Sequence, residues 1–240
     1  MSTKKPTVVL VHGAFAESSS WQGVVERLQA QAVPVVAVAN PLRSVAGDAA
    51  YVRDVVADVA GPVILVGHSY GGIVITEAAA DNDSVVGLVY VNAFAPEHGE
   101  NAFDLSAKFP GSTLGAALKA YPVATGGNEL AIRPDVFRQQ FVADVPAAVA
   151  DVLAATQRPV TQAALVEGLA AEKPAWATLP SWFVFGDADR NIPVALHRFM
   201  ADRAGARNAT EVADASHAIS VSRPDAVTAT ILDAVEHWDA

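Results

Sequence analysis

The feature that most restricts how this chain can fold is a serine placed between two glycines directly after an apolar run. The run 62–66 leads into residues 67–71, Gly-His-Ser-Tyr-Gly, and residues 72–80 have the composition of a helix. At a sharp turn from a strand into a helix, a serine takes a strained conformation with its hydroxyl exposed above the sheet, and glycines beside it let neighbouring backbone approach closely. The pattern therefore predicts a strand, a tight turn and a helix, with Ser69 held as a nucleophile.

A nucleophilic serine needs partners, because its hydroxyl reacts slowly at neutral pH unless a histidine accepts its proton and a carboxylate orients that histidine. The chain order that accompanies this turn is serine, acid, histidine. After Ser69, the apolar run 181–185 leads into the acidic loop 186–193, and His217 lies in the loop 213–218 before the last expected helix. Loops at the carboxyl ends of parallel strands meet at one edge of a sheet, so these segments are able to assemble one site.

The first strand supplies a fourth element of this site. Residues 7–11 are apolar and largely β-branched, and they end at His12 and Gly13. The loop after such a strand commonly provides one backbone N–H of an oxyanion hole, and the residue after the nucleophile provides the other. Ala14 and Tyr70 are therefore the candidate donors.

In order and context, these motifs resemble the α/β-hydrolase fold over nearly the whole chain. The chain is most similar to the small esterases related to plant methyl esterases and hydroxynitrile lyases, because its first strand runs straight into His12 and Gly13. The resemblance implies that Asp189, three residues after the loop glycine, is the acid. Asp187 directly follows that glycine, where we expect it to cap the turn. Lyases of this group carry a lysine after the catalytic histidine and a threonine after the first-loop histidine. This chain has Ala218 and Gly13 there, which favours hydrolysis over cyanohydrin cleavage.

Apolar runs alternate with helical stretches, which is typical of βαβ units, and near-continuous apolar strands are typical of a sheet buried on both faces. Strands are expected at residues 7–11, 35–39, 63–66, 85–91, 181–185 and 210–212. Helices are expected at residues 20–32, 48–60, 72–80, 193–204 and 224–238. The predicted fold class is therefore α/β, an α/β-hydrolase fold with a mostly parallel sheet of about six strands flanked by helices.

The segment 95–179 breaks this alternation. It carries helix-like stretches at 134–142 and 147–155, no clear strand pattern, and repeated Pro and Gly. So long a segment is more than a plain loop. We expect a single domain over residues 1–240, with a core formed by 1–94 and 180–240 and a helical cap inserted at 95–179. The resemblance implies that the cap covers the nucleophile and shapes the substrate pocket.

The expected pocket combines residues near the nucleophile with one tryptophan of the cap. Its candidate residues are His12, Phe15, His68, Phe94 and Trp176. Other apolar residues of the cap are candidate walls, although such side chains more often pack a cap onto a sheet. They are Phe103, Leu105, Phe109, Leu114, Leu118, Tyr121, Phe137 and Phe141.

The remaining ionisable residues receive structural roles. His68 is expected to be positioned by the turn, and the other histidines are expected at the surface or in packing. Three arginines are candidate partners of a substrate carboxylate, but a solvated or ion-paired role is commoner. The histidines are His98, His197 and His237, and the arginines are Arg133, Arg138 and Arg158.

Composition limits the classes of partner, cofactor and location that we expect for this chain. The net charge of −10 argues against nucleic acid. No apolar run is long enough to span a bilayer and no signal region follows the first residues, so the expected location is cytoplasmic. The chain has no cysteine, and the pair Asp187 and Asp189 lacks an accompanying His or Glu cluster, so neither a metal nor a cofactor is expected. The expected partner is a small-molecule ester, bound by a monomer or homodimer.

The predicted function is that of a carboxylesterase-like serine hydrolase, which cleaves a small or medium, largely apolar ester through an acyl-enzyme on Ser69, with His217 as base and Asp189 orienting it. A lactonase, thioesterase or perhydrolase would use the same three residues, so these remain open. A hydroxynitrile lyase, a cofactor-free oxygenase and a non-catalytic ligand receptor are further alternatives on the same fold.

Overall fold

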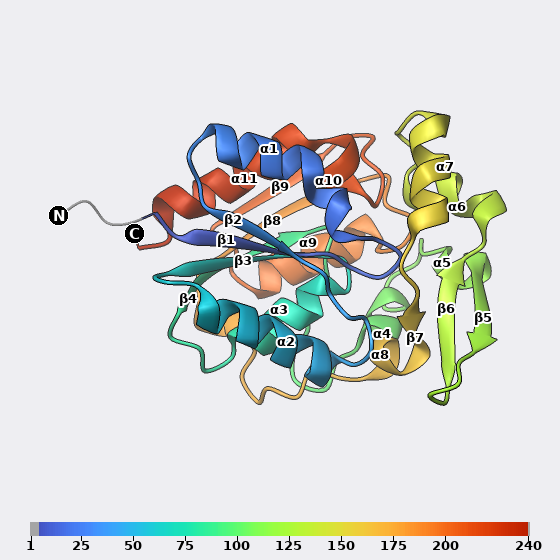
Figure 1. Cartoon of the computed structure of the whole chain (residues 1–240), viewed down its shortest axis with the longest axis horizontal. Helices are drawn as coiled ribbons and strands as arrows, with labels where there is room; N and C mark the ends of the chain where they lie inside the picture. Colours follow the sequence, from blue (N-terminus) through green and yellow to red (C-terminus); the bar gives the residue numbers. More distant parts are fainter. Residues whose placement is uncertain (1–4, 240) are drawn as a thin grey trace.

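A six-stranded sheet forms the centre of the computed structural model, which describes residues 5–239 (Figure 1). The strands are β1 (Thr7–Val11), β2 (Val35–Val38), β3 (Val63–His68), β4 (Val85–Val91), β8 (Ser181–Gly186) and β9 (Asn208–Val212). Their order is β2-β1-β3-β4-β8-β9, and every neighbouring pair is parallel. The predicted parallel sheet of about six strands is confirmed, and each expected strand falls on an observed one.

Helices cover both faces of this sheet (Figure 1). On one face lie α1 (Gln22–Ala30), the short α10 (Ile219–Ser222) and α11 (Pro224–His237), next to the 3-10 turn η1 (Ser18–Trp21). On the other lie α2 (Val45–Asp58), α3 (Gly71–Ala79) and α9 (Val194–Arg203). Alternate residues of a strand point to opposite faces. Accordingly, Val8 and Leu10 pack with Trp21 and α11, whereas Val9 and Val11 pack with α2 and α3.

The chain between β4 and β8, here called the β4–β8 segment, adds a second layer beside the carboxyl end of the sheet, at the right of Figure 1. Its helices are α4 (Ala102–Ser106), α5 (Leu114–Ala117), α6 (Pro134–Phe141), α7 (Ala147–Thr156), α8 (Gln162–Val166) and the 3-10 turn η2 (Ala175–Ala177). Its strands β5 (Leu118–Pro122), β6 (Asn128–Ile132) and β7 (Val160–Thr161) form an antiparallel sheet in the order β5-β6-β7.

These three strands correct the expectation that the segment is helical throughout. Residues such as Lys119, Pro122 and Asn128 are poor strand formers, so the sequence of β5 and β6 carries no period-two pattern. The available signal was the Gly126-Gly127 pair, whose φ angles of +95° and +77° make the reversal between the two strands. Pairing within the hairpin overrides the weak local preference.

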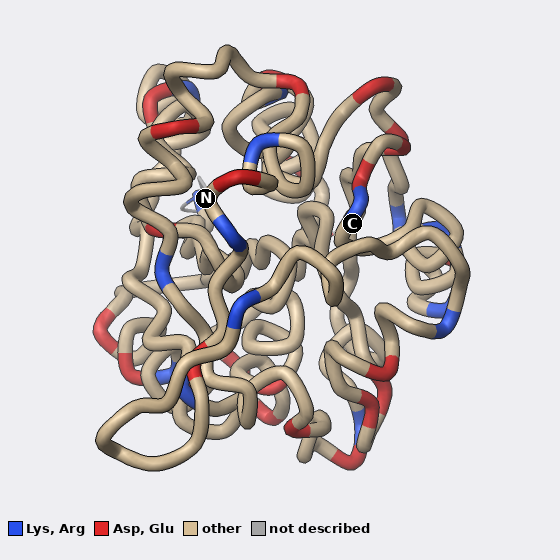
Figure 2. The backbone as a smooth tube through the Cα atoms, turned by 90° about the vertical axis from the view of Figure 1, so that its right-hand side faces the viewer, with Lys and Arg blue, Asp and Glu red and all other residues tan. Residues whose placement is uncertain are grey.

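The surface carries charges of both signs. Figure 2 shows Lys and Arg positions interspersed with Asp and Glu positions along the chain trace. Within residues 5–239, no helix combines the length and apolar character that crossing a bilayer requires.

Candidate active site

Ser69 lies at the turn between β3 and α3, as the sequence predicts. Its φ angle is +55°, a left-handed conformation that residues other than glycine seldom adopt. The turn is held by backbone hydrogen bonds, because Ser69 N–H donates to the Asn92 carbonyl (3.2 Å) and the Ser69 carbonyl accepts from Phe94 N–H (3.2 Å). A Cβ at Gly71 would lie 2.5 Å from the Val11 carbonyl oxygen, so only glycine fits beside β1.

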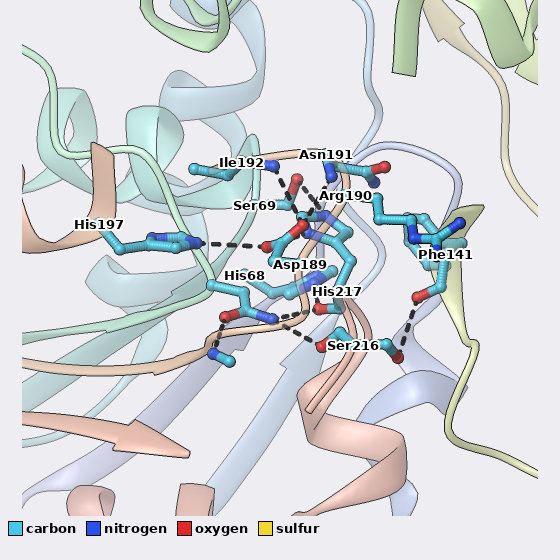
Figure 3. Close-up of polar contacts among 12 residues, drawn as sticks. His68, Ser69, Phe141, Asp189, Arg190, Asn191, Ile192, His197, Ser216 and His217 are labelled. Carbon is cyan, nitrogen blue, oxygen red and sulfur yellow. Dashed lines mark hydrogen bonds and ion pairs between the residues drawn. The ribbon is translucent and has the colours of Figure 1, made fainter. Parts of the chain in front are cut away.

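The structure brings Ser69 together with His217 and Asp189 from three different loops (Figure 3). Ser69 Oγ lies 2.9 Å from His217 Nε2, and His217 Nδ1 lies 2.7 Å from Asp189 Oδ2. Since an ionised carboxylate only accepts hydrogen bonds, Nδ1 carries the imidazole proton and Nε2 is left to accept from the serine hydroxyl. This is the tautomer that a general base requires.

The Asp189 carboxylate accepts four hydrogen bonds although it is buried. Oδ1 accepts from the backbone N–H groups of Asn191 (2.7 Å) and Ile192 (3.0 Å), and Oδ2 accepts from His217 and from His197 Nε2 (3.2 Å). Burial opposes ionisation, but the neighbouring His217 and the hydrogen bonds from His197 and His217 outweigh it and hold the pKa of Asp189 well below its usual range. The carboxylate therefore stays charged and fixed in orientation.

His197 is the residue of this site that sequence reasoning missed. It lies in the first turns of α9, is buried, and stacks on the Phe185 ring at 5.1 Å with an interplanar angle of 13°. Burial lowers its pKa, although the hydrogen bond to Asp189 opposes that shift. The sequence signal that could have indicated this contact is the position of His197 near the start of a helix that begins soon after Asp189. In such a helix, the first side chains that face the protein interior lie close to the preceding loop.

Asp187, the other acid of this loop, does not contact His217 through its side chain. Its Oδ1 accepts a hydrogen bond from Asp214 N–H at 2.7 Å, so it ties together the loops after β8 and β9 from the exposed side. The expected cap of its own turn is thus replaced by a hydrogen bond to the neighbouring loop. Within residues 5–239, no group of three or more His, Cys, Asp or Glu side chains is arranged to hold a metal ion.

The two candidate oxyanion donors border the same space as Ser69. A Cβ at Gly13 would lie 2.6 Å from both the His68 carbonyl oxygen and Ser69 Cβ, so the first loop rests directly on the turn. Neither Ala14 N–H nor Tyr70 N–H donates a hydrogen bond to another of the described residues. The Tyr70 ring is anchored away from that space, because its hydroxyl donates to the buried Asp48 carboxylate at 2.9 Å.

Beside these groups lies a cavity of about 610 Å³. It is bordered by Ser69 and by many residues of the β4–β8 segment, and none of its lining residues is Lys, Arg, Asp, Glu or His. Of the candidate pocket and wall residues, the lining includes Phe15, Phe94, Phe103, Phe109, Leu114 and Leu118. The three arginines are not among its lining residues. Arg133 pairs with Asp135, Arg158 pairs with Glu17, and Arg138 donates to the Val145 carbonyl.

The remaining pocket candidates are placed in the surrounding protein and not in the cavity lining. His12 Nδ1 donates to the Gly13 carbonyl (2.9 Å), His68 Nε2 donates to the His217 carbonyl (3.0 Å), and Trp176 Nε1 donates to the Pro96 carbonyl (2.8 Å). Burial lowers the pKa of His12 to about 4 and that of His68 to about 3, so both rings are neutral. Each side chain turns toward a backbone carbonyl that it satisfies, and this removes it from the lining.

Comparison with known proteins identifies the class. Residues 8–230 match the model of the alpha/beta hydrolase family, so this chain belongs to that family. It is 27% identical to the alpha/beta hydrolase nvfD of Aspergillus novofumigatus over 252 residues, 96% of each chain.

Two solved structures have the same fold. Polyneuridine aldehyde esterase is similar with a TM-score of 0.81 and 19% identity, over 96% of this chain and 99% of that one. A methylesterase from Arabidopsis is similar with a TM-score of 0.79 and 18% identity, over the same shares. The predicted resemblance and fold class are thus confirmed, and the chain is an alpha/beta hydrolase with esterase-type neighbours.

We expect substitution of Asp189 and of Asp187 to have different effects on kcat. Asp189→Asn should lower kcat by at least about a hundredfold with folding intact, because an amide in that place favours the wrong imidazole tautomer. Asp187→Asn should keep kcat within about threefold, since its amide oxygen can still accept from Asp214 N–H. Steady-state kinetics and circular dichroism of both variants give the answer. Loss of kcat in the Asp187 variant alone would move the acid to that position.

Stability should fall between pH 7.5 and 5.5. Below a pKa of about 6.5 the unfolded histidines take up protons that the folded, buried His12 and His68 refuse, so each should cost about 1.4 kcal/mol at pH 5.5. Urea unfolding at the two pH values measures the change. His12→Asn, whose amide can keep the bond to Gly13, should lose the part of this pH dependence that His12 contributes, about 1.4 kcal/mol. Equal stability at both pH values would mean that these rings are not held neutral.

Proposed function

We propose that this alpha/beta hydrolase is a carboxylesterase-like serine hydrolase acting on small or medium, uncharged esters. The observation that carries the proposal is the hydrogen-bonded series Ser69–His217–Asp189, whose serine borders a cavity with no charged lining residue. The first half of this observation supports nucleophilic catalysis, and the second half supports the choice of substrate.

In the proposed reaction, Ser69 Oγ attacks the ester carbonyl carbon while His217 Nε2 takes the hydroxyl proton. Asp189 stabilises the imidazolium that forms. As the tetrahedral intermediate collapses, the carbon–oxygen bond to the alcohol breaks and His217 returns the proton to the leaving alkoxide. Water then attacks the acyl-enzyme by the same steps, which releases the acid and restores Ser69.

Charge that develops on the carbonyl oxygen requires donors that are already in place. The N–H groups of Ala14 and Tyr70 have no acceptor among residues 5–239 and belong to residues that border the cavity beside Ser69. A single donor of this kind typically contributes about a hundredfold to a thousandfold in rate. We assign both to the oxyanion hole.

The cavity supports an uncharged substrate, because a charged group entering it would lose water without gaining an ionic partner. Its volume of about 610 Å³ is typical of a site for a small organic molecule. The β4–β8 segment supplies Phe103, Phe109, Leu114 and Leu118 to the wall. We therefore propose that residues 95–179 act as a substrate-shaping cap on a core of residues 1–94 and 180–240.

Covalent labelling tests the nucleophile. A fluorophosphonate probe should add one label to the intact protein and none to Ser69→Ala, because the Ser69 hydroxyl has the His217 imidazole within hydrogen-bond distance to accept its proton. Ser112→Ala is the matched control, since Ser112 borders the same cavity and its hydroxyl forms no hydrogen bond with a histidine of the described chain. Mass spectrometry reads the result. A label that persists in Ser69→Ala and is lost in Ser112→Ala would overturn the assignment.

The substrate class is tested with p-nitrophenyl esters that differ in charge. The pentanoate ester should have a kcat/KM at least about tenfold above that of the adipate monoester, whose free carboxylate must lose its hydration in the cavity. Initial rates at constant ionic strength measure the ratio. Faster turnover of the charged ester would instead indicate that one of the three arginines outside the cavity reaches the substrate.

A further inference from the structure

Asn191 is a buried polar residue that borders the cavity and has no role in the proposed chemistry. It is 2% exposed and stands two residues after Asp189, to which its backbone N–H donates at 2.7 Å (Figure 3). That hydrogen bond fixes its main chain relative to the candidate acid. Its side chain is consequently held in a constant position beside the reacting groups.

The orientation of the Asn191 amide follows from its neighbours. The Arg190 carbonyl can only accept, and it lies 3.0 Å from Gln140 Nε2, so Gln140 must present its NH₂ group there. The same Nε2 lies 2.7 Å from Asn191 Oδ1, which must therefore be an oxygen. Thr113 Oγ1 donates to Gln140 Oε1 at 2.8 Å, which agrees with this assignment. With Oδ1 facing Gln140, Asn191 Nδ2 points to the opposite side.

Nδ2 donates to no acceptor among residues 5–239. It is also absent from the set of side-chain atoms that lack a hydrogen-bond partner and are fully enclosed by protein, so part of its surface is accessible. It therefore touches open space, and the space that Asn191 borders is the cavity. A donor in this position is solvated or bonded only by what occupies the cavity. Nδ2 is thus an unused hydrogen-bond donor aimed at the substrate volume.

The other polar side chains of the lining are less suited to this role. The Ser106 hydroxyl donates to the Phe103 carbonyl, and the Tyr70 hydroxyl donates to Asp48. Ser112 is half-buried and Gln162 is exposed, so water competes at both. Asn191 alone among these combines burial, a fixed orientation and a free donor.

On this basis, and resting on the proposed function, we infer that Asn191 Nδ2 is a specificity-determining donor. It selects esters that carry a second, uncharged oxygen acceptor, such as a ketone or ether oxygen, over hydrocarbon esters of the same shape. A hydrocarbon substrate would displace water from Nδ2 and leave the donor unpaired, whereas an acceptor oxygen replaces that water. The cavity is consequently apolar over most of its wall and polar at one defined point.

The test uses matched ester pairs. On the acyl side, p-nitrophenyl 5-oxohexanoate is compared with p-nitrophenyl 5-methylhexanoate; on the alcohol side, 2-methoxyethyl butanoate is compared with butyl butanoate. For at least one pair, the ratio of kcat/KM values should favour the acceptor ester and should fall about tenfold or more in Asn191→Asp and Asn191→Leu. Asn191→Asp keeps an oxygen for Gln140 and replaces the donor by an anionic oxygen, whereas Asn191→Leu removes the donor without adding a charge. Ser112→Ala should keep the wild-type ratio.

Binding separates this inference from the proposed function. Dissociation constants for the same esters are measured in Ser69→Ala and in Ser69→Ala combined with Asn191→Asp, where turnover plays no part. A selective loss of affinity for the acceptor ester in the double variant would support the inference even if the wild-type protein hydrolysed neither pair. The inference would be overturned if substitution of Asn191 left the ratio of kcat/KM values unchanged for both ester pairs. If the wild-type protein hydrolyses neither pair, unchanged ratios of the dissociation constants would overturn it. Melting temperatures establish that each variant is folded.

Discussion

The buried carboxylate of Asp189 is the group on which the arrangement of the candidate site depends. It joins the loop after β8, the first turns of α9 and the loop that carries His217, through four hydrogen bonds to one side chain. A buried charge is costly unless it is fully paired, so these contacts are required by its burial as well as useful for catalysis. His197 belongs to this constraint, because it supplies the fourth donor and covers the carboxylate.

The β4–β8 segment does more than border the cavity, because it also holds the loop that carries His217. Ala218 N–H donates to the Phe141 carbonyl at 3.0 Å, and the Phe141 ring lies 5.0 Å from the His217 ring. Asp144 accepts from the Ser216 hydroxyl and pairs with Arg223 at 3.0 Å. The segment that borders the cavity therefore also holds the candidate base in place, through α6 and the loop that follows it.

The strained turn at Ser69 shows how local sequence and packing cooperate. A positive φ at a serine persists only where surrounding structure over-determines it. Here the close approach of Gly13 and Gly71 to neighbouring backbone supplies that surrounding structure. Because both contacts depend on the absence of a side chain, the glycines at positions 13 and 71 indicate them in the sequence.

The sequence by itself determined the parallel sheet, the turn at Ser69 and the loops holding His217 and Asp189, because apolar runs and glycine-flanked turns are local patterns with local causes. Only the tertiary structure decided which side chains face the cavity. The side chains of His12, His68 and Trp176 each donate to a backbone carbonyl and do not line the cavity. The orientation of the Asn191 amide is set by its hydrogen bond with Gln140, which is remote in sequence. The contact of His197 with Asp189 and the pairing of β5 with β6 also became definite only in the folded structure, although the spacing of His197 and the Gly126-Gly127 pair were weak local signals for them. Such outcomes depend on how each side chain packs and forms hydrogen bonds in the folded protein, and these contacts leave no periodicity in the chain.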